Sequence, residues 1–191
     1  MTGSTGAIFG TRLLEVLANS DIETHLIVSK WAQQTLEHET PYTMAMLRDL
    51  ASEAYSSGDM GARISSGSFH TDGMVIVPCS MRSAASIAYG YGDHLVHRAA
   101  DVILKEKRKL VLVARELPLS TVHLENLLKL SKMDVTILPP MPAFYNQPKS
   151  LGEMVDHIVM RILDQFDVSR ELVARWDGKL QNNVKRIHPL K

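Results

Sequence analysis

The sequence predicts an α/β fold in which helices cover both faces of a parallel sheet. Short apolar runs rich in β-branched residues alternate with longer segments of helical periodicity. This alternation is typical of a doubly wound sheet whose crossovers are right-handed. The 191 residues, 45% of them hydrophobic, suffice for one compact domain and would be cramped as two.

The individual elements follow from these two periodicities. Strands are expected where the apolar runs are short and bounded by polar residues, at 22–29, 74–78, 110–114 and 135–138. Their continuous apolar character is typical of strands buried on both faces. Apolar residues at helical spacing predict the helices, at 10–19, 30–38, 43–54, 80–89, 93–108, 120–132 and 150–166.

Composition and charge exclude several classes of protein. The 21 acidic and 21 basic residues cancel, so we expect no nucleic-acid partner and no membrane association. No apolar stretch approaches the roughly 20 residues that span a bilayer, and no secretory signal begins the chain. We therefore expect a cytoplasmic protein, or a mitochondrial one if a targeting segment has been removed. One cysteine excludes an intrachain disulfide, and the eight histidines form no HxH or HExxH pair, so we expect no metal site.

Residues 2–7, Thr-Gly-Ser-Thr-Gly-Ala, have the composition of a loop between a strand and a helix. A glycine-rich turn at the start of a helix presents backbone N–H groups and a positive dipole end to a phosphate. Such turns also begin many helices for steric reasons alone. No strand precedes this loop in the sequence. We expect the loop to be held less rigidly without one, at a cost in ligand affinity or in folding.

A second candidate anion site lies on the expected helix at 93–108. Arg98, Asp101 and Lys105 stand at i, i+3 and i+7 and share one polar stripe on an otherwise apolar helix. In one interpretation, Asp101 and Lys105 form an ordinary i, i+4 ion pair at a solvated edge. In the other, Arg98 and Lys105 bind an anion through charge-assisted hydrogen bonds. The sequence leaves both interpretations open.

Polar residues also follow the expected strands. Arg115 and Glu116 come directly after the third strand, at the end where open α/β sheets bind ligands, although they could equally form a surface ion pair. Ser80 follows another strand and can contribute to a site or cap the next helix. Tyr145 lies in a proline-rich loop, where it could either contact a ligand or serve as a packing residue. Cys79 has no evident base, so we expect it to be a small buried residue. Together, these strand ends predict an anion site, suited to a phosphorylated cofactor.

Ordered motifs along nearly the whole chain, from Met1 to about Trp176, carry a family resemblance. They lie at 2–7, 28–31, 39–40, 65–69, 78–81, 98–102, 104–106, 115–116, 123–126, 142–145 and 175–176. In these motifs the chain resembles the UbiX/Pad-type flavin prenyltransferases, including members that are named as subunits of hydroxyarylic acid decarboxylases.

The resemblance implies a single-domain, Rossmann-like (flavodoxin-like) FMN-binding flavoprotein over residues 1–178, followed by a polar C-terminal tail at 179–191. It implies an enzyme, a prenyltransferase that transfers a dimethylallyl group from dimethylallyl phosphate to reduced FMN, first at N5 and then by ring closure at C6. The prenylated FMN would pass to a UbiD-type decarboxylase in aromatic acid decarboxylation. The family commonly forms homo-oligomers, as dodecamers with sites at subunit interfaces, and its chemistry requires no metal.

The resemblance also implies roles for individual residues. It assigns FMN binding to Gly3, Thr5, Ser29, Ser80, Met81 and Arg98. It assigns binding of the prenyl donor to Glu39, Lys105, Arg115, Glu116, Tyr145, Arg161 and Trp176, with Glu39 reaching in from another subunit. Catalysis would involve Glu116, Lys105, Thr5 and Ser80, and Glu116 would relay protons.

The chain departs from the family pattern at several positions. Thr5 stands where many members have serine, and Ala114 replaces a frequent proline. Asp134 and Asp167 occupy turn positions where glycine is usual, so we expect left-handed backbone there at a small cost in stability.

Two other functions stay open. One is an FMN-dependent cysteine decarboxylase of the same general fold, although residues 78–81 are Pro-Cys-Ser-Met where that group typically has a Pro-Ala-Ser-Ala-Asn type of segment. The other is a non-catalytic, FMN-carrying subunit of a phenolic acid decarboxylase complex, which would bind FMN without turning it over.

Overall fold

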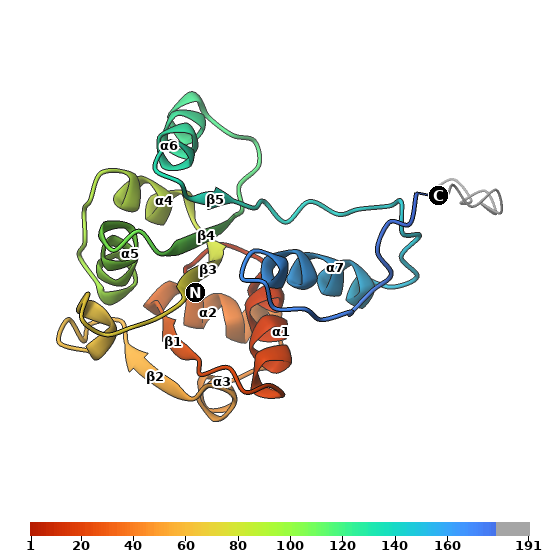
Figure 1. The fold of residues 1–191 in the computed structure, drawn as a ribbon, viewed down its shortest axis with the longest axis horizontal. Helices are drawn as coiled ribbons and strands as arrows, with labels where there is room; N and C mark the ends of the chain where they lie inside the picture. The colour runs from red at the N-terminus through yellow and green to blue at the C-terminus, as the bar shows by residue number, and fades with distance from the viewer. Residues whose placement is uncertain (179–191) are drawn as a thin grey trace.

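Short parallel strands form the centre of the protein, and helices surround them (Figure 1). The computed structural model describes residues 1–178, so the predicted polar tail at 179–191 lies outside the described residues. In chain order the elements are α1 (Ala7–Ala18), β1 (His25–Val28), α2 (Lys30–Glu39), α3 (Met44–Leu50), β2 (Glu53–Ser56), the 3-10 helix η1 (Arg63–Ser65), β3 (Gly73–Cys79), α4 (Met81–Ala88), α5 (Leu95–Lys105), β4 (Lys109–Ala114), α6 (Thr121–Ser131), β5 (Thr136–Ile137) and α7 (Leu151–Asp164). Among these described helices, none is long and apolar enough to cross a membrane.

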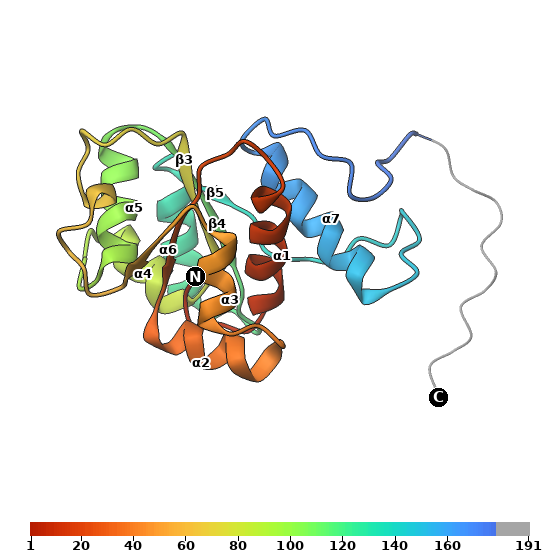
Figure 2. The ribbon, with the colours of Figure 1, turned by 90° about the horizontal axis from the view of Figure 1, so that it is seen from below.

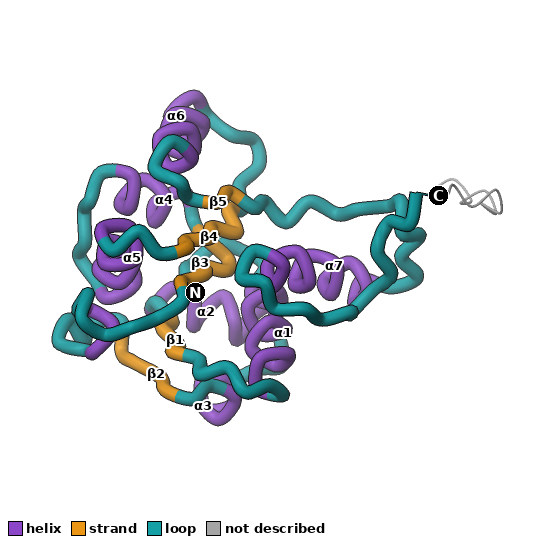
Figure 3. Tube along the Cα trace, in the orientation of Figure 1, coloured by secondary structure: helices purple, strands orange, loops and turns teal. Residues whose placement is uncertain are grey.

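All strand pairs are parallel, as predicted, but the sheet has two parts. β1 pairs with β2, with His25 opposite Glu53. β3, β4 and β5 pair in that order, with Gly73 opposite Lys109 at one end of the β3–β4 ladder. Figure 3 shows both groups of strands between the helices, and the long loop that leads from β5 out to α7. The sheet therefore consists of two short parallel ladders.

Met1 and Thr2 lie between these two parts. The amino nitrogen of Met1 donates to the Ile27 carbonyl at 2.6 Å, and the Met1 carbonyl accepts from the Ser29 N–H at 3.1 Å. The Thr2 N–H donates to the Pro78 carbonyl at 3.1 Å. Beside Met1, a mostly apolar cavity of about 570 Å³ is lined by residues of β1, β3, α1, α5 and α7. The loop at 2–7 is thus tied to both parts of the sheet through only two residues.

Helices cover both faces of the β3–β4 ladder, which confirms the doubly wound arrangement. Adjacent residues of a strand point to opposite faces. Val77 and Val113 accordingly pack with residues of α1 and α7, whereas Ile76 and Leu112 pack with residues of α4 and α5. Figure 2 shows α5 on one side of the strands and α1 and α7 on the other.

The predicted helix at 43–54 is wrong in its second half. α3 ends at Leu50, and Glu53–Ser56 form β2. Before the two strands begin, the Thr24 N–H donates to Ser52 Oγ at 3.0 Å and the Ser52 N–H donates to Thr24 Oγ1 at 3.1 Å. This exchange and the pairing with β1 override the helical spacing of the local sequence, because strand formation depends on tertiary context.

The two aspartates at expected glycine positions adopt left-handed backbone. The φ angle is 63° at Asp134 and 57° at Asp167. Asp134 closes the turn after α6, and Asp167 lies in the turn after α7. The expected backbone geometry is confirmed at both positions.

Candidate functional site

Several predicted site residues lie at one edge of the sheet, where parallel strands end. Ser29 follows β1, Ser80 follows β3, and Arg115 and Glu116 follow β4. The Arg115 N–H donates to the carbonyl of Cys79 at 3.1 Å, which fixes Arg115 beside the start of α4. The side chains of Arg115 and Glu116 are exposed, and Arg115 forms no ion pair with the described residues. The predicted surface pair is therefore absent from this part of the chain, and both charges face outward at the ligand-binding edge.

Ser29 and Ser80 also begin helices. Ser29 Oγ accepts from the Ala32 N–H at 3.2 Å, and Ser80 Oγ accepts from the Ser83 N–H at 3.3 Å. The interpretation of Ser80 as a helix cap is thus confirmed. Capping does not exclude ligand binding, because a hydroxyl has two acceptor positions and one hydrogen to donate. Met81, the first residue of α4, is buried at 7% exposure.

Glu39 binds the glycine-rich loop of its own chain. Its Oε2 accepts from the N–H groups of Gly6 at 2.8 Å and Ala7 at 3.0 Å, at the start of α1. Burial alone would raise the pKa of Glu39, but hydrogen bonds from Thr5, Ala7 and Gly6 together hold that pKa below its usual value. The expected contact of Glu39 with another subunit stays a prediction, and within its own chain the carboxylate occupies two amides that we considered for a phosphate.

We predict that Glu39→Gln loosens this loop. The amide cannot supply the negative charge that the two N–H groups and the helix dipole favour, so the free energy of unfolding should fall by about 1 kcal/mol at pH 7, a small value because solvent screens an exposed group. Since the pKa of Glu39 is lowered in the folded state, the stabilisation is present above the unfolded pKa and lost as the pH falls through the folded one. Urea unfolding at pH 7 and in acid tests both points.

A matched control is Glu37→Gln on the same helix. The Glu37 carboxylate contacts Gln33 at 3.0 Å and caps no helix. Equal losses of stability in both variants would contradict the capping role of Glu39.

One hydroxyl and one glycine of the loop bear on whether it can contact a bound flavin. Ser4 Oγ is buried and has no hydrogen-bond partner among the described residues. A Cβ at Gly3 would lie 2.6 Å from Trp31 Cβ, so only glycine allows this close approach of the loop to α2. A buried hydroxyl without a partner costs free energy unless a ligand or water satisfies it. The loop therefore has a polar group available for FMN, which the sequence did not single out.

Arg98 and Lys105 both lie on α5, but they do not form one anion site in this chain. Arg98 donates from Nε to the Ser65 carbonyl at 3.2 Å and from Nη1 to Asp101 Oδ2 at 2.9 Å. Lys105 Nζ lies 2.5 Å from Glu106 Oε1. The alternative Asp101–Lys105 pair is therefore wrong, because each partner is held by a nearer charge.

Lys105 also lies far from Glu116. It ends α5 just before β4 begins, whereas Glu116 follows the end of β4. The six residues of β4 alone span about 20 Å at the rise of a β-strand. One chain therefore cannot bring these two side chains to the same phosphate.

Tyr145 and Trp176 come together on the α7 side of the molecule. Their ring centroids lie 5.8 Å apart in an edge-to-face arrangement. The Tyr145 hydroxyl lies 2.9 Å from Nε2 of His157, which is buried at 7% exposure on α7. Burial, followed by the charge of Arg161, lowers the pKa of His157, so its neutral ring can accept from the tyrosine. Sequence reasoning missed His157, because only the packing of the loop against α7 reveals its contact.

Arg161 lies on α7, four residues after His157, and is held by Asp164. Its Nη1 lies 2.9 Å from Asp164 Oδ2, and Arg175 binds the same carboxylate through two nitrogens at 2.7 and 3.0 Å. Hydrogen bonds from Arg175, reinforced by the charges of both arginines, lower the pKa of Asp164. This network fixes the segment that carries Trp176 to α7.

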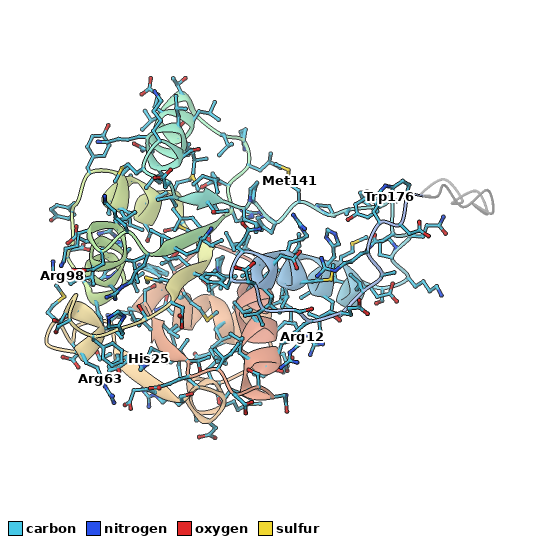
Figure 4. All side chains as sticks on the ribbon, viewed as in Figure 1. Arg12, His25, Arg63, Arg98, Met141 and Trp176 are labelled. Atoms are coloured by element: carbon cyan, nitrogen blue, oxygen red, sulfur yellow. The ribbon has the colours of Figure 1, made fainter. Side chains whose placement is uncertain are left out.

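The predicted site residues thus form separate groups within one chain. Figure 4 shows Arg98 and Trp176 at opposite ends of the molecule. Ser29, Ser80 and Arg115 form another group, at the ends of β1, β3 and β4. A site that uses all of these residues must combine more than one subunit.

Cys79 is confirmed as a buried residue. It is fully buried, and burial raises the pKa of its thiol to about 12. A thiol that stays protonated at neutral pH is a poor nucleophile.

Comparison with known proteins agrees with this architecture. The model of the family described as Flavoprotein matches residues 1–165. A probable UbiX-like flavin prenyltransferase of Bacillus subtilis (strain 168) is 60% identical over 178 residues, which cover 93% of this chain and 87% of the relative. The chain belongs to the UbiX-like flavoproteins.

Two solved structures of UbiX-like flavoproteins match this chain along nearly its whole length. A dodecameric FMN-dependent UbiX-like decarboxylase from Escherichia coli O157:H7 is 52% identical, with a TM-score of 0.91 over 93% of this chain and 100% of the other. A structure of AnUbiX (PadA1) in complex with FMN and dimethylallyl pyrophosphate is 47% identical, with a TM-score of 0.92 over 94% of this chain and 95% of the other. The expected flavodoxin-like α/β fold is confirmed.

Proposed function

We propose that this UbiX-like flavoprotein is a flavin prenyltransferase. It transfers the dimethylallyl group of dimethylallyl phosphate to reduced FMN, first to N5 and then to C6. The product, prenylated FMN, would serve a UbiD-type decarboxylase. No metal enters this chemistry.

The observation that carries the proposal is the polar edge of the sheet. Ser29, Ser80 and Arg115 gather at the strand ends beside the loop at 2–7, in a chain 47% identical to a protein solved with FMN and dimethylallyl pyrophosphate. Strand ends and a helix N-terminus are where α/β proteins bind phosphorylated cofactors. We assign FMN to this edge, held by Gly3, Thr5, Ser29, Ser80, Met81 and Arg98.

The charges of the chain suit the departure of phosphate. Breaking the carbon–oxygen bond leaves an allyl cation and a phosphate anion, so cationic side chains stabilise the leaving group. Lys105, Arg115 and Arg161 would supply this charge, and all three are exposed. Glu116, beside Arg115, would relay the proton that the flavin must lose on ring closure.

Aromatic side chains would protect the allyl cation. Tyr145 and Trp176 lie edge to face and remain half exposed, at 51% and 50%. A π face attracts a positive carbon and excludes water that would otherwise capture it. These two residues would close the donor side of the site.

We further propose that the complete site forms between subunits of a homo-oligomer, a dodecamer as in the Escherichia coli O157:H7 relative. The separation of Lys105 from Glu116 along β4, and of Arg98 from Trp176 across the molecule, supports this arrangement (Figure 4). Exposed apolar residues on α6, among them Val122, Leu124 and Leu128, are available for subunit contacts.

The test is anaerobic incubation of the purified protein with reduced FMN and dimethylallyl phosphate, followed by mass spectrometry of the extracted flavin. A flavin heavier by one isoprenyl unit is the expected result. Bound but unmodified FMN would favour the FMN-carrying subunit. Release of carbon dioxide from a peptidyl cysteine, without flavin modification, would favour the cysteine decarboxylase.

We predict that His157→Phe weakens use of the prenyl donor. Phenylalanine fills the buried position but cannot accept from the Tyr145 hydroxyl. Loss of one hydrogen bond of about 1 kcal/mol frees the ring of Tyr145, so KM for dimethylallyl phosphate should rise about fivefold while kcat changes less. Initial rates measured against donor concentration test this. His70→Phe at an exposed position is the control, and unchanged KM in His157→Phe would contradict the role.

A further inference from the structure

A chain of hydrogen bonds connects Ser80 to a buried histidine. Ser80 Oγ donates to Ser83 Oγ at 3.3 Å, and Ser83 Oγ lies 3.1 Å from Nε2 of His97. Nδ1 of His97 lies 2.9 Å from Asp93 Oδ1. Ser83 is 4% exposed and His97 is 3% exposed, whereas Asp93 reaches the surface. This series of hydrogen bonds therefore runs from the solvent, through α5 and α4, to the end of the sheet where we place FMN.

The hydrogens along this chain have one consistent order. Asp93 can only accept from His97, so Nδ1 carries the hydrogen and Nε2 accepts from the Ser83 hydroxyl. Ser83 Oγ is then free to accept from the Ser80 hydroxyl. Ser80 has then used its only hydrogen, and because one of its two acceptor positions takes the Ser83 N–H, one remains available. In this order Ser80 presents an acceptor, and no donor, to a ligand.

The surroundings of His97 favour its neutral form. Burial has the largest effect on the pKa of His97 and lowers it, and the nearby His94 lowers it further. Asp93 raises this pKa, but the net effect is a lowering. Among the described residues, the charged and titratable groups that face His97 are Asp93, His94, whose ring centroid is 3.9 Å away, and Arg82, 3.4 Å from Asp93. A protonated His97 would donate from both nitrogens, and the order of hydrogens between Ser83 and Ser80 would reverse.

A metal ion explains this cluster less well. One nitrogen or oxygen atom from each of Asp93, His94 and His97 lies within 4.8 Å of the others. Arg82 and the positive end of α5 would both repel a cation there. The contact between Asp93 and His97 is accounted for as a hydrogen bond.

We propose that Asp93, His97 and Ser83 are positioning residues that fix the Ser80 hydroxyl as a hydrogen-bond acceptor for an N–H or O–H donor of FMN. The inference rests on the proposed function in placing FMN beside Ser80. In addition, His97 does not touch the cofactor but determines whether the Ser80 hydroxyl acts on FMN as an acceptor or as a donor. A neutral His97 favours FMN binding, and a protonated one opposes it.

The decisive experiment is a double-mutant cycle on FMN affinity, measured by quenching of flavin fluorescence. Ser80→Ala and His97→Ala should each raise Kd for FMN about fivefold, as loss of one hydrogen bond does. His97→Ala should have no further effect in the Ser80→Ala background, because it acts only through Ser80. An equal rise in Kd in both backgrounds would overturn the proposal.

A second variant covers the case in which His97→Ala does not fold. In His97→Gln, the amide oxygen can accept from Ser83 but does not titrate. FMN affinity of the wild type should fall as the pH decreases through the pKa of His97, whereas His97→Gln should keep an affinity near that of the wild type at pH 7.5 and give a flat profile. Parallel profiles would contradict the inference. His70→Gln, at an exposed position, is the control.

These outcomes separate the inference from the proposed function. Coupled FMN binding without a prenylated product would overturn only the prenyltransferase activity. A prenylated product with independent effects of Ser80 and His97 would overturn only the positioning role. A wild-type protein that binds no FMN would overturn both.

Discussion

Glu116→Gln should bind FMN as the wild type does and lose prenyl transfer by about 10²- to 10⁴-fold, the range for removal of a positioned acid–base group. Gln keeps the length of the side chain and an oxygen that can accept from the Leu117 N–H, which lies 3.1 Å from Glu116 Oε1. It cannot take up a proton. The backbone after β4 should therefore stay in place while the proton relay is lost.

Two readouts separate this effect from a loss of binding. Flavin fluorescence gives Kd for FMN, and mass spectrometry of the extracted flavin after a single turnover gives the transfer rate. Glu37→Gln, an exposed glutamate on α2, is the matched control and should keep full activity. Transfer at the wild-type rate in Glu116→Gln would remove Glu116 from the chemistry and leave the released phosphate as the base.

The residues at the strand ends were predictable because topology places them. Once β1, β3 and β4 are recognised as parallel strands, the residues that follow them must share one edge of the sheet. Ser29, Ser80 and Arg115 are found there, and the buried state of Cys79 follows from the same pattern. The sequence could not predict β2, because its pairing with β1 depends on contacts outside the local segment.

Contacts between distant side chains could not be predicted in the same way. The hydrogen bond between His157 and Tyr145 depends on how the loop that carries Tyr145 folds back onto α7. The series of hydrogen bonds from His97 to Ser80 depends on the packing of α5 against α4. In the sequence both histidines lie among apolar residues, and nothing in their spacing distinguishes them from ordinary core positions.

A mixture of two inactive variants should regain activity if the site is shared between subunits. In Lys105→Ala the missing cation belongs to the end of α5, and in Glu116→Gln the missing carboxylate belongs to the opposite end of β4. Each variant alone should be nearly inactive. In randomly mixed oligomers, about one quarter of the sites would combine an intact Lys105 from one subunit with an intact Glu116 from another. Co-expression with two different affinity tags isolates these mixed oligomers.

The control for this mixture is Lys105→Ala combined with the double variant Lys105→Ala/Glu116→Gln. No intact Lys105 is then present, so the mixture should stay inactive even though Glu116 is intact in half of its subunits. Lys105→Ala removes only an exposed contact with Glu106 and should leave folding unchanged, so inactivity cannot be attributed to a damaged core. If the mixture of the two single variants also stays inactive, Lys105 and Glu116 do not meet across an interface. Because β4 holds them about 20 Å apart within one chain, they could then not act on the same phosphate. One of the two residues would then not belong to the proposed site.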